Sequence, residues 1–356
     1  MAASTSSAEQ SKPLIYDLSQ TELKALLASW GEKSFRVDQI WQGLYSQFWQ
    51  APEQFTTLSK AIRQKLKENL RFSALNPVRE LAAKDGNTVK TLFRLPDGPA
   101  IEVVLMRYEQ RRTLCISTQV GCAMNCSFCA TGQMGFKRHL TSGEIVEQVI
   151  YYARMLAAQD EKVTNVVVMG MGEPFHNYEA TIKAINILND HDGFNFGERR
   201  FTISTVGLVP MIYKFANEKR QINLAISLHA TDNTLRSSMI PINDKHPVEE
   251  LITACHQYVA QTNRRITFEW ALIQGVNDST QNARDLADLL HGLLCHVNII
   301  LLNPTNDFNG QASSQKQALL FQAELESHNI PCTIRLRRGI EIAAGCGQLA
   351  STDTPL

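Results

Sequence analysis

From Arg112 onward, the sequence alternates short apolar runs with longer amphipathic segments at roughly even spacing. The apolar runs are rich in β-branched residues and predict six strands: TLCISTQ, VTNVVVMGM, RRFTISTV, INLAISLH, RITFEWALI and HVNIILLNP. The segments between them repeat apolar residues every three or four positions and predict helices: SGEIVEQVIYYARMLAA, EATIKAINILNDH, LVPMIYKFANEK, PVEELITACHQYVAQ and STQNARDLADLLHGLL. Six βα units with strongly apolar strands predict an α/β fold in which helices cover the outer face of a parallel sheet. Six repeats favour a partial (β/α)6 barrel, and an open doubly wound sheet is the alternative.

The rest of the chain divides by composition and periodicity. Residues 1–13 are small and polar, lack the order of a signal peptide, and predict a disordered lead-in. Residues 14–76 repeat apolar positions at helical spacing and predict a small helical accessory domain. Residues 77–111 predict a β-hairpin connector with an Asp-Gly turn. We expect the barrel over residues 112–340 and a C-terminal tail over residues 341–356.

Charge and hydropathy limit the binding partners and the cellular location that can be expected for this chain. The 356 residues include 35 Lys+Arg and 35 Asp+Glu, so no overall field attracts a polyanion, and local clusters would have to bind one. No apolar run is long enough to cross a membrane, which makes the cytoplasm the default location. In that compartment the eight cysteines are expected to be reduced, metal-bound or catalytic, because stable disulfide frameworks are rare there.

Three of these cysteines, Cys122, Cys126 and Cys129, follow the first predicted strand in Cys-x3-Cys-x2-Cys spacing. Chemistry in such barrels takes place at the carboxyl ends of the strands. Structural zinc is usually bound by two Cys-x2-Cys pairs, and the sequence has no second pair. Iron-sulfur clusters usually have four cysteine ligands, so three clustered ligands leave one iron open to a small molecule. We therefore expect a [4Fe-4S] cluster, with zinc or three unrelated buried cysteines as alternatives.

This spacing resembles that of the radical S-adenosylmethionine (SAM) superfamily, in which SAM binds the open iron and is cleaved to a 5′-deoxyadenosyl radical. The segment MGMGEP at the end of the second strand resembles the superfamily's SAM-amino motif. By this resemblance, Gly172 and Glu173 face the ammonium group of SAM. Residues at the ends of three further strands are expected to contact its ribose or adenine, with a capped turn as the alternative for each: Ser204, Ser227, Leu228, His229 and Asn303.

Two cysteines outside the trio have contrasting settings. Cys115 lies on the first predicted strand, where an ordinary core cysteine is expected. Cys346 lies between two glycines in the tail, an unusual place for a buried structural thiol. Cys255, Cys295 and Cys332 lie in apolar contexts and are predicted to be core residues.

A more specific resemblance covers roughly residues 102–350. The segments GCAMNCSFCATGQMGFKRHLT, GMGEP, TISTVG, SLHA and CGQLA occur in the order found in the RlmN/Cfr family of radical SAM RNA methyltransferases, and FRVDQIWQGLY extends the likeness loosely to the helical domain. The resemblance implies that a first SAM methylates Cys346 and that a second supplies the radical that joins this methyl carbon to adenine. It also implies that Cys115 attacks Cys346, releasing the product and leaving a disulfide, with Glu102 as the general base.

The same resemblance implies methylation of adenine C2 in 23S ribosomal RNA, and in some members of tRNA, with an electron donor such as flavodoxin. Independently of it, C2 of adenine is electrophilic and cannot attack a sulfonium methyl directly, which favours a radical route. The C8-methylating branch uses the same cysteines and is an alternative, although CAMNCSFC is closer to the C2 branch. Two further interpretations compete: a radical SAM enzyme with a small-molecule or peptide substrate, in which Cys346 is a cluster ligand, and a zinc or electron-transfer protein.

Local basic groups are expected to contact RNA phosphates despite the zero net charge. They are Arg111, Arg112, Lys137, Arg138, His139, Arg199, Arg200, Arg335, Arg337 and Arg338. The segment KAIRQKLKENLRF adds a further group, so we expect the helical domain to bind RNA. For each group alone, a solvated helix face is the alternative. The target adenine would have to leave its stack to reach a buried radical.

Overall fold

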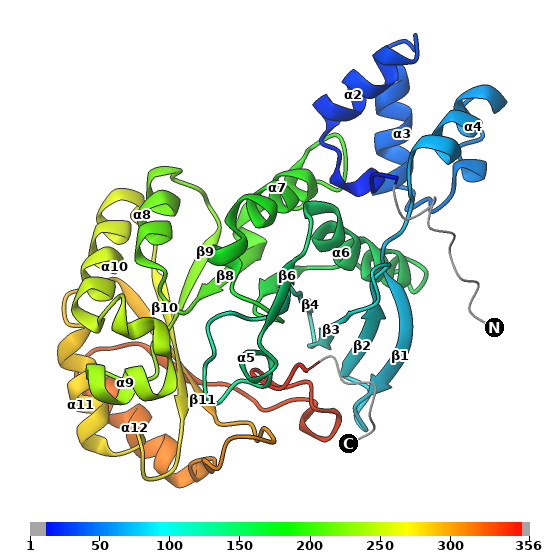
Figure 1. Cartoon of the computed structure of the whole chain (residues 1–356). Coiled ribbons are helices and arrows are strands. Elements are labelled where there is room, and N and C mark those ends of the chain that lie inside the picture. Colours follow the sequence, from blue (N-terminus) through cyan, green and yellow to red (C-terminus); the bar gives the residue numbers. More distant parts are fainter. Residues whose placement is uncertain (1–11, 351–356) are drawn as a thin grey trace.

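The six predicted strands form the centre of one ten-stranded sheet in the computed structural model, which describes residues 12–350 (Figure 1). They lie side by side in chain order and pair in parallel: β4 (Arg112–Cys115), β7 (Asn165–Val168), β8 (Phe201–Thr205), β9 (Asn223–Ser227), β10 (Ile266–Leu272) and β11 (Cys295–Leu301). A seventh parallel strand, β12 (Cys332–Ile334), pairs with β11. It was not predicted because three residues are too few to show the periodicity of a strand.

The helices that connect these strands cover the outer face of the sheet (Figure 1). All five predicted helices are present: α6 (Ser142–Ala157), α7 (Tyr178–Asn189), α8 (Val209–Asn217), α10 (Val248–Thr262) and α11 (Thr280–Leu289). Two more, α9 (Asn233–Met239) and α12 (Gln315–Ser327), are additions. The first is short, and the exposed Leu319 and Leu320 of the second blur its apolar period.

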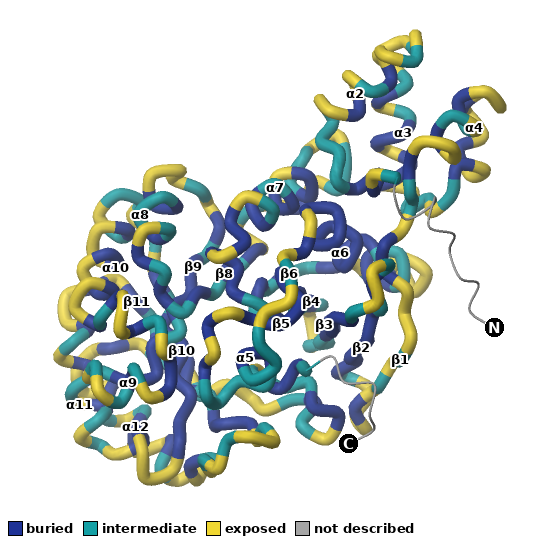
Figure 2. Tube along the Cα trace, viewed as in Figure 1, coloured by how far each residue is buried: buried dark blue, intermediate teal, exposed yellow. Residues whose placement is uncertain are grey.

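The sheet does not close on itself. Its edge strands are β1 (Asn76–Ala82) and β12, and no pairing joins them among residues 12–350. The six central strands are largely buried, whereas β1 and the outer faces of the helices are exposed (Figure 2). The prediction of an α/β fold with a partial barrel is therefore confirmed.

The predicted hairpin connector extends the same sheet. Strands β1 (Asn76–Ala82), β2 (Thr88–Arg94) and β3 (Ala100–Arg107) pair antiparallel, and β3 pairs antiparallel with β4. The Asp-Gly turn between β1 and β2 forms as expected, with Gly86 at a φ of 67°. The connector therefore places β3 directly beside β4, the first strand of the barrel, and β2 on the far side of β3.

Three helices near the N-terminus form a projecting lobe beside α6 and α7 (Figure 1). They are α2 (Gln20–Ser29), α3 (Phe35–Tyr45) and α4 (Lys60–Asn69), as the apolar period predicted. The Trp41 indole donates to Asp190 over 3.2 Å, and Asp17 accepts a 2.6 Å hydrogen bond from the backbone N–H of Gly143. These contacts fix the lobe to the barrel.

Short elements complete the chain. Strands β5 (Gln119–Gly121) and β6 (Phe136–His139) form a two-stranded sheet, and helix α5 (Ala130–Gln133) lies between them in the sequence. Single 3₁₀ turns occur at Ile15–Asp17, Pro52–Gln54, Pro174–Asn177, Glu198–Arg200, Pro241–Asp244 and Ile340–Ile342. Within residues 12–350, none of the helices has the length and apolar character needed to cross a membrane.

Candidate active site

The three clustered cysteines lie on the cluster loop (residues 122–135) between β5 and β6. Backbone hydrogen bonds fix its shape: the N–H of Cys122 donates to Gly135 over 3.0 Å, and that of Cys129 to Cys126 over 3.1 Å. At Gly132 an added Cβ would lie 2.9 Å from the backbone N and O of Cys126, so only glycine fits there. The loop therefore has a defined conformation set by its own backbone.

The donor set of the loop fits a cluster. Among residues 12–350, the only three His, Cys, Asp or Glu residues whose ligand atoms all lie within 4.8 Å of one another are Asp190, His191 and Asp192. At least one pair of the three cysteine sulfurs is therefore farther apart than that, and farther than the roughly 3.8 Å between two sulfurs on one tetrahedral zinc. Sulfurs that bind different irons need not be so close, so the residues present fit a [4Fe-4S] cluster.

Without a bound metal, burial keeps two of these thiols protonated. Burial raises the pKa of Cys122 to about 12 and that of Cys126 well above its ordinary value. Neighbouring thiolates and Glu173 raise both further, whereas Arg236 opposes the shift at Cys126. Because iron ligands must be thiolates, binding of the cluster would release these protons and supply the positive charge that the thiols lack.

The glycine-rich segment after β7 is shaped by contacts within the protein. Gly172 has a φ of 100°, and an added Cβ would lie 2.5 Å from Gln119. Glu173 accepts 2.9 Å hydrogen bonds from the backbone N–H groups of Phe175 and Val206. Burial raises the pKa of Glu173 to about 7, and these bonds oppose the rise. A carboxylate has further lone pairs, so the site still fits an ammonium group.

Polar side chains form a row across the ends of neighbouring strands. The hydroxyl oxygens of Ser204 and Ser227 lie 3.4 Å apart. The strand register pairs Ser227 with Glu269, and Glu269 with Asn298, whose side-chain amide donates to the carboxylate over 2.8 Å. Glu269 and Asn298 were not predicted, although a carboxylate within an apolar strand is a signal that could have identified the first.

Leu228 and His229 follow this row. Leu228 is fully buried, and its backbone N–H donates to the carbonyl of Glu269 over 3.2 Å. Nδ1 of His229 accepts a 2.9 Å hydrogen bond from Ala271, and its ring packs edge-on against Phe128 of the cluster loop, with centroids 4.9 Å apart. Burial lowers the pKa of His229 to about 3, so the ring is neutral and Nε2 carries the proton. Leu228 can offer a ligand only its backbone and its apolar surface.

A buried arginine joins two of the strand ends. Arg236 is fully buried and donates to the carbonyls of Val206, Ser227 and Leu228 over 2.6 to 3.2 Å. Its fourth bond, of 2.9 Å, is to the side chain of Asn243. Nothing in the local sequence marks Arg236, because its partners come from separate loops.

The tail loop (residues 343–350) returns to this end of the sheet and presents Cys346. The side-chain amide of Asn303 donates to the carbonyl of Cys346 over 3.1 Å. The other polar atom of that amide, Oδ1, is buried and has no hydrogen-bond partner among the described residues. An orphaned buried acceptor fits a hydroxyl or amino group of a ligand such as SAM.

Cys346 lies within electrostatic range of the other candidate residues. It is exposed, yet burial raises the pKa of its thiol to about 12, and Glu269, Cys115 and Cys129 raise it further. Both observations hold if the sulfur faces the open interior of the barrel, where protein surrounds it and solvent still reaches it. Cys115 and Cys346, from opposite ends of the barrel sequence, are both free thiols, and the charge of one affects the other.

Cys115 and Glu102 share one face of the sheet. The register pairs Cys115 of β4 with Val104 of β3, and directly opposed residues point to the same face. Glu102 lies two residues before Val104 and therefore points the same way. Burial raises the pKa of Cys115 to about 12.

Glu102 is buried and already has two partners. One carboxylate oxygen lies 2.9 Å from Nζ of Lys90, and the other accepts a 2.9 Å hydrogen bond from the backbone N–H of Ala350. The general base predicted by resemblance is thus in contact with the tail loop. Lys90 was not predicted, although a charge within the run TVKTLF is a visible signal.

The remaining cysteines occupy core positions, as predicted. Cys255 and Cys295 are buried, and Cys332 is half-buried and packs against the main core.

Several of the arginines predicted to contact RNA form ion pairs within the protein. Arg112 pairs with Glu161, and Arg138 pairs with Asp97 and Glu144.

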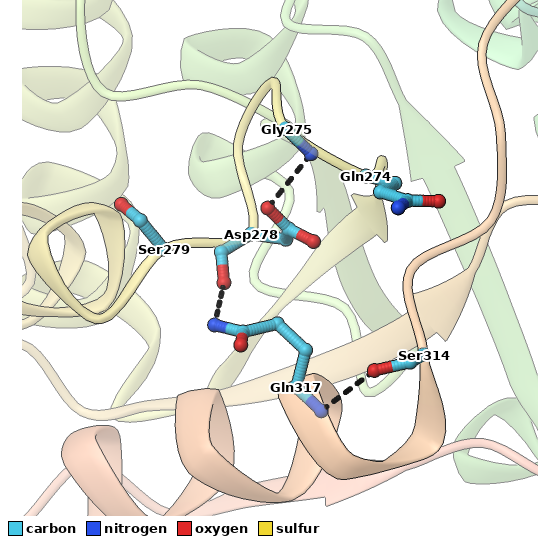
Figure 3. Close-up of a pocket in the computed structure, with 6 residues that line it drawn as sticks. All are labelled: Gln274, Gly275, Asp278, Ser279, Ser314 and Gln317. Atoms are coloured by element: carbon cyan, nitrogen blue, oxygen red, sulfur yellow. Dashed lines mark hydrogen bonds between the residues drawn. The ribbon is translucent and has the colours of Figure 1, made fainter.

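A surface pocket between α11 and α12 does not contain the candidate residues (Figure 3). It is lined by Gln274, Gly275, Asp278, Ser279, Ser314 and Gln317. Its polar groups serve local structure: Asp278 accepts from the N–H of Gly275 over 3.0 Å, and the side chain of Gln317 donates to the carbonyl of Asp278 over 2.6 Å. We do not assign this pocket a role in the chemistry.

Comparison with known proteins supports the assignment of class. A partial barrel with a Cys-x3-Cys-x2-Cys loop at its strand ends defines a radical SAM protein, and residues 116–287 match the family model of the Radical SAM superfamily. Residues 15–71 match the model of the ribosomal RNA large subunit methyltransferase N-terminal domain. Superfamily members use a [4Fe-4S] cluster and SAM.

Similarity over nearly the whole chain identifies the family. The dual-specificity RNA methyltransferase RlmN 1 of Myxococcus xanthus is 46% identical over 95% of this chain and 94% of its own. A probable dual-specificity RNA methyltransferase RlmN of Chloroflexus aurantiacus is 47% identical over 94% of this chain and 92% of its own. The crystal structure of a radical SAM methyltransferase from Sphaerobacter thermophilus superposes with a TM-score of 0.94 at 49% identity, covering 96% of this chain and all of that one. The chain belongs to the RlmN family of RNA methyltransferases.

Proposed function

We propose that this protein methylates C2 of an adenine in 23S ribosomal RNA and in tRNA through a methylated Cys346. The main supporting observation is that Cys346, which is itself exposed, has Cys115 and Cys129 within electrostatic range. A methyl carrier must be close both to the cofactor and to the thiol that releases the product. The names of the relatives and of the N-terminal family model support an RNA substrate.

The candidate residues divide into two binding groups. Cys122, Cys126 and Cys129 would bind the cluster. SAM would contact Gly172, Glu173, Ser204, Ser227, Leu228, His229 and Asn303. When bound, the cluster and SAM supply the 5′-deoxyadenosyl radical, and the protein orients SAM and shields the site from water.

Cys346, Cys115 and Glu102 would carry out the transfer. The sulfur of Cys346 would lose its proton and accept a methyl group from a first SAM. That methyl group would give one hydrogen atom to the 5′-deoxyadenosyl radical and bond to C2 of adenine, and the unpaired electron left on the adduct would return to the cluster. Deprotonated Cys115 then attacks the sulfur of Cys346, forming a disulfide and breaking the bond to the methylene carbon. That carbon takes up a proton and becomes the methyl group, while Glu102 accepts the proton from C2. Because burial raises the pKa of Cys115, its proton must be removed before the attack, and a reductant must later reopen the disulfide.

We also propose roles for the parts of the chain. Residues 14–76 would bind RNA, residues 77–111 would link that domain to the barrel of residues 112–340, and residues 341–356 would form the catalytic tail. The lead-in of residues 1–13 and the end of the tail extend beyond the described residues. An electron donor such as flavodoxin would reduce the cluster, and we propose the cytoplasm as the location because ribosomal RNA and tRNA would be the substrates.

Mass spectrometry of nucleosides from cells with and without the gene tests this function. We expect 2-methyladenosine to disappear from both ribosomal RNA and tRNA when the gene is deleted. Loss of 8-methyladenosine instead would assign the protein to C8 chemistry, and no change in either nucleoside would contradict the proposal.

A further inference from the structure

One buried ion pair contacts both ends of the tail loop. Nζ of Lys90 lies 2.9 Å from one carboxylate oxygen of Glu102 and donates to the carbonyl of Ala343 over 3.0 Å. The other oxygen of Glu102 accepts the backbone N–H of Ala350 over 2.9 Å. Ala343 and Ala350 lie on either side of Cys346, three residues before it and four after it. The pair thus closes a ring of contacts with Cys346 between its two attachment points.

The sheet register explains why this pair lies beneath the tail. Lys90 of β2 is directly opposite Val104 of β3, and Val104 is directly opposite Cys115 of β4. Cross-strand neighbours share a face, so Lys90, Glu102 and Cys115 point to the same side of the sheet. The other side of β2 packs on α6, where the hydroxyl of Tyr152 donates to Thr91 over 2.7 Å.

Between its ends the tail loop is supported mainly through its backbone. The N–H of Ala130 donates to the carbonyl of Gly347 over 2.8 Å, and the hydroxyl of Thr131 donates to that of Leu349 over 2.6 Å. Gly347 has a φ of 81°, and the nearest atom to an added Cβ is 3.6 Å away. The ends are therefore fixed by buried charges, whereas the segment around Cys346 is held by neutral hydrogen bonds, with open space beside Gly347.

We propose that Lys90 is a positioning residue that holds both ends of the tail loop, directly at Ala343 and through Glu102 at Ala350. This inference rests on the proposed function of Cys346. Its sulfur must face SAM, then adenine, then Cys115, and fixed ends let the sulfur turn between these partners without the loop detaching. Removing Lys90 leaves Glu102 buried without its counter-charge and the Ala343 carbonyl without its donor. Both attachments weaken together.

Hydrogen exchange on the anaerobically prepared, cluster-containing protein tests the proposal. In Lys90→Met, amides of residues 343–350 should exchange at least about tenfold faster, because local opening becomes easier. Amides of the cluster loop should keep their rates, except that of Ala130, which donates to the tail loop at Gly347. Lys90→Arg, which keeps the charge and a donor, should restore much of the protection. Lys84→Met removes an exposed lysine close by in the sequence and should change nothing.

Further measurements separate positioning from simple stability. Lys90→Met should still cleave SAM but form less methylated RNA per 5′-deoxyadenosine, and Lys90→Arg should recover part of this ratio. If Lys90→Met does not fold, the double variant Lys90→Met/Glu102→Gln, which has no uncompensated charge, should fold and still show fast exchange in the tail. Unchanged exchange in the tail of a folded Lys90 variant would overturn the proposal. Since exchange is measured without RNA, this result stands apart from any failure to find methylated adenine.

Discussion

The cluster loop and the tail loop both present cysteines at the open end of the barrel, but they are held in different ways. The cluster loop is fixed by its own backbone bonds, and two of its three cysteines are buried. The tail loop depends on groups from elsewhere in the chain, among them the side chains of Lys90, Glu102 and Asn303 and the backbone N–H of Ala130, and its cysteine is exposed. The difference matches the proposed tasks, since cluster ligands need constant geometry whereas a methyl carrier must face several partners in turn.

The largest expected effect separates the two loops by their cysteines. Alanine at Cys122, Cys126 or Cys129 should abolish both iron binding and SAM cleavage. The cluster loop supplies only these three cysteine ligands, so none can replace the one that is lost. Cys346→Ala should keep its iron and lose only methylation of RNA. Iron and sulfide content per chain, measured beside 5′-deoxyadenosine formation, checks both statements. If Cys346→Ala also lost its iron, Cys346 would be a cluster ligand and the comparison would fail. Stoichiometric zinc with little iron in the wild-type protein would contradict the assignment of a [4Fe-4S] cluster to these cysteines.

A matched pair of glycine substitutions gives a smaller effect. In Gly132→Ala the new Cβ meets the backbone of Cys126, and such overpacking costs about 1–3 kcal/mol. Iron content and melting temperature should therefore fall. In Gly347→Ala the space is open, but a positive φ costs about 1–2 kcal/mol for an L-residue. Iron content should stay the same, while methylation of RNA slows by up to about tenfold. Equal loss of iron in both variants would show that the loops are not independent.

RNA binding should give the smallest differences. Arg138 beside the cluster loop is already paired with two carboxylates, whereas Arg337, before the tail loop, is exposed and donates only to the carbonyl of Leu302 among the described residues. Affinity for RNA should fall steeply with salt, and Arg337→Glu should weaken binding to all sequences alike, with a salt slope smaller by about one. Arg284→Glu on the outer helix α11 is the control. An RNA affinity that does not change with salt would contradict this expectation.

Local patterns in the sequence predicted much of the fold and part of the site. The six predicted strands of the barrel lie in long runs rich in apolar and β-branched residues, whereas β12 has only three residues and leaves no period to detect. The cluster ligands were found because Cys122, Cys126 and Cys129 are close in sequence. Lys90 and Arg236 were not found, because their roles depend on partners brought together by folding. Lys90 and the Ala343 carbonyl, for example, are 253 positions apart.

The central claim is that Cys115 and Cys346 act as a pair, and trapping of RNA on Cys115→Ala tests it most directly. This variant should bind its cluster, methylate Cys346 and attack adenine, but it cannot break the bond between Cys346 and the RNA. Denaturing gels should therefore show RNA crosslinked to the protein, and peptide mass spectrometry should locate the link at Cys346. If Cys115 served only as a core residue, the variant would lose about 1 kcal/mol of stability and turn over normally. Repeated turnover by Cys115→Ala without trapped RNA would contradict the account.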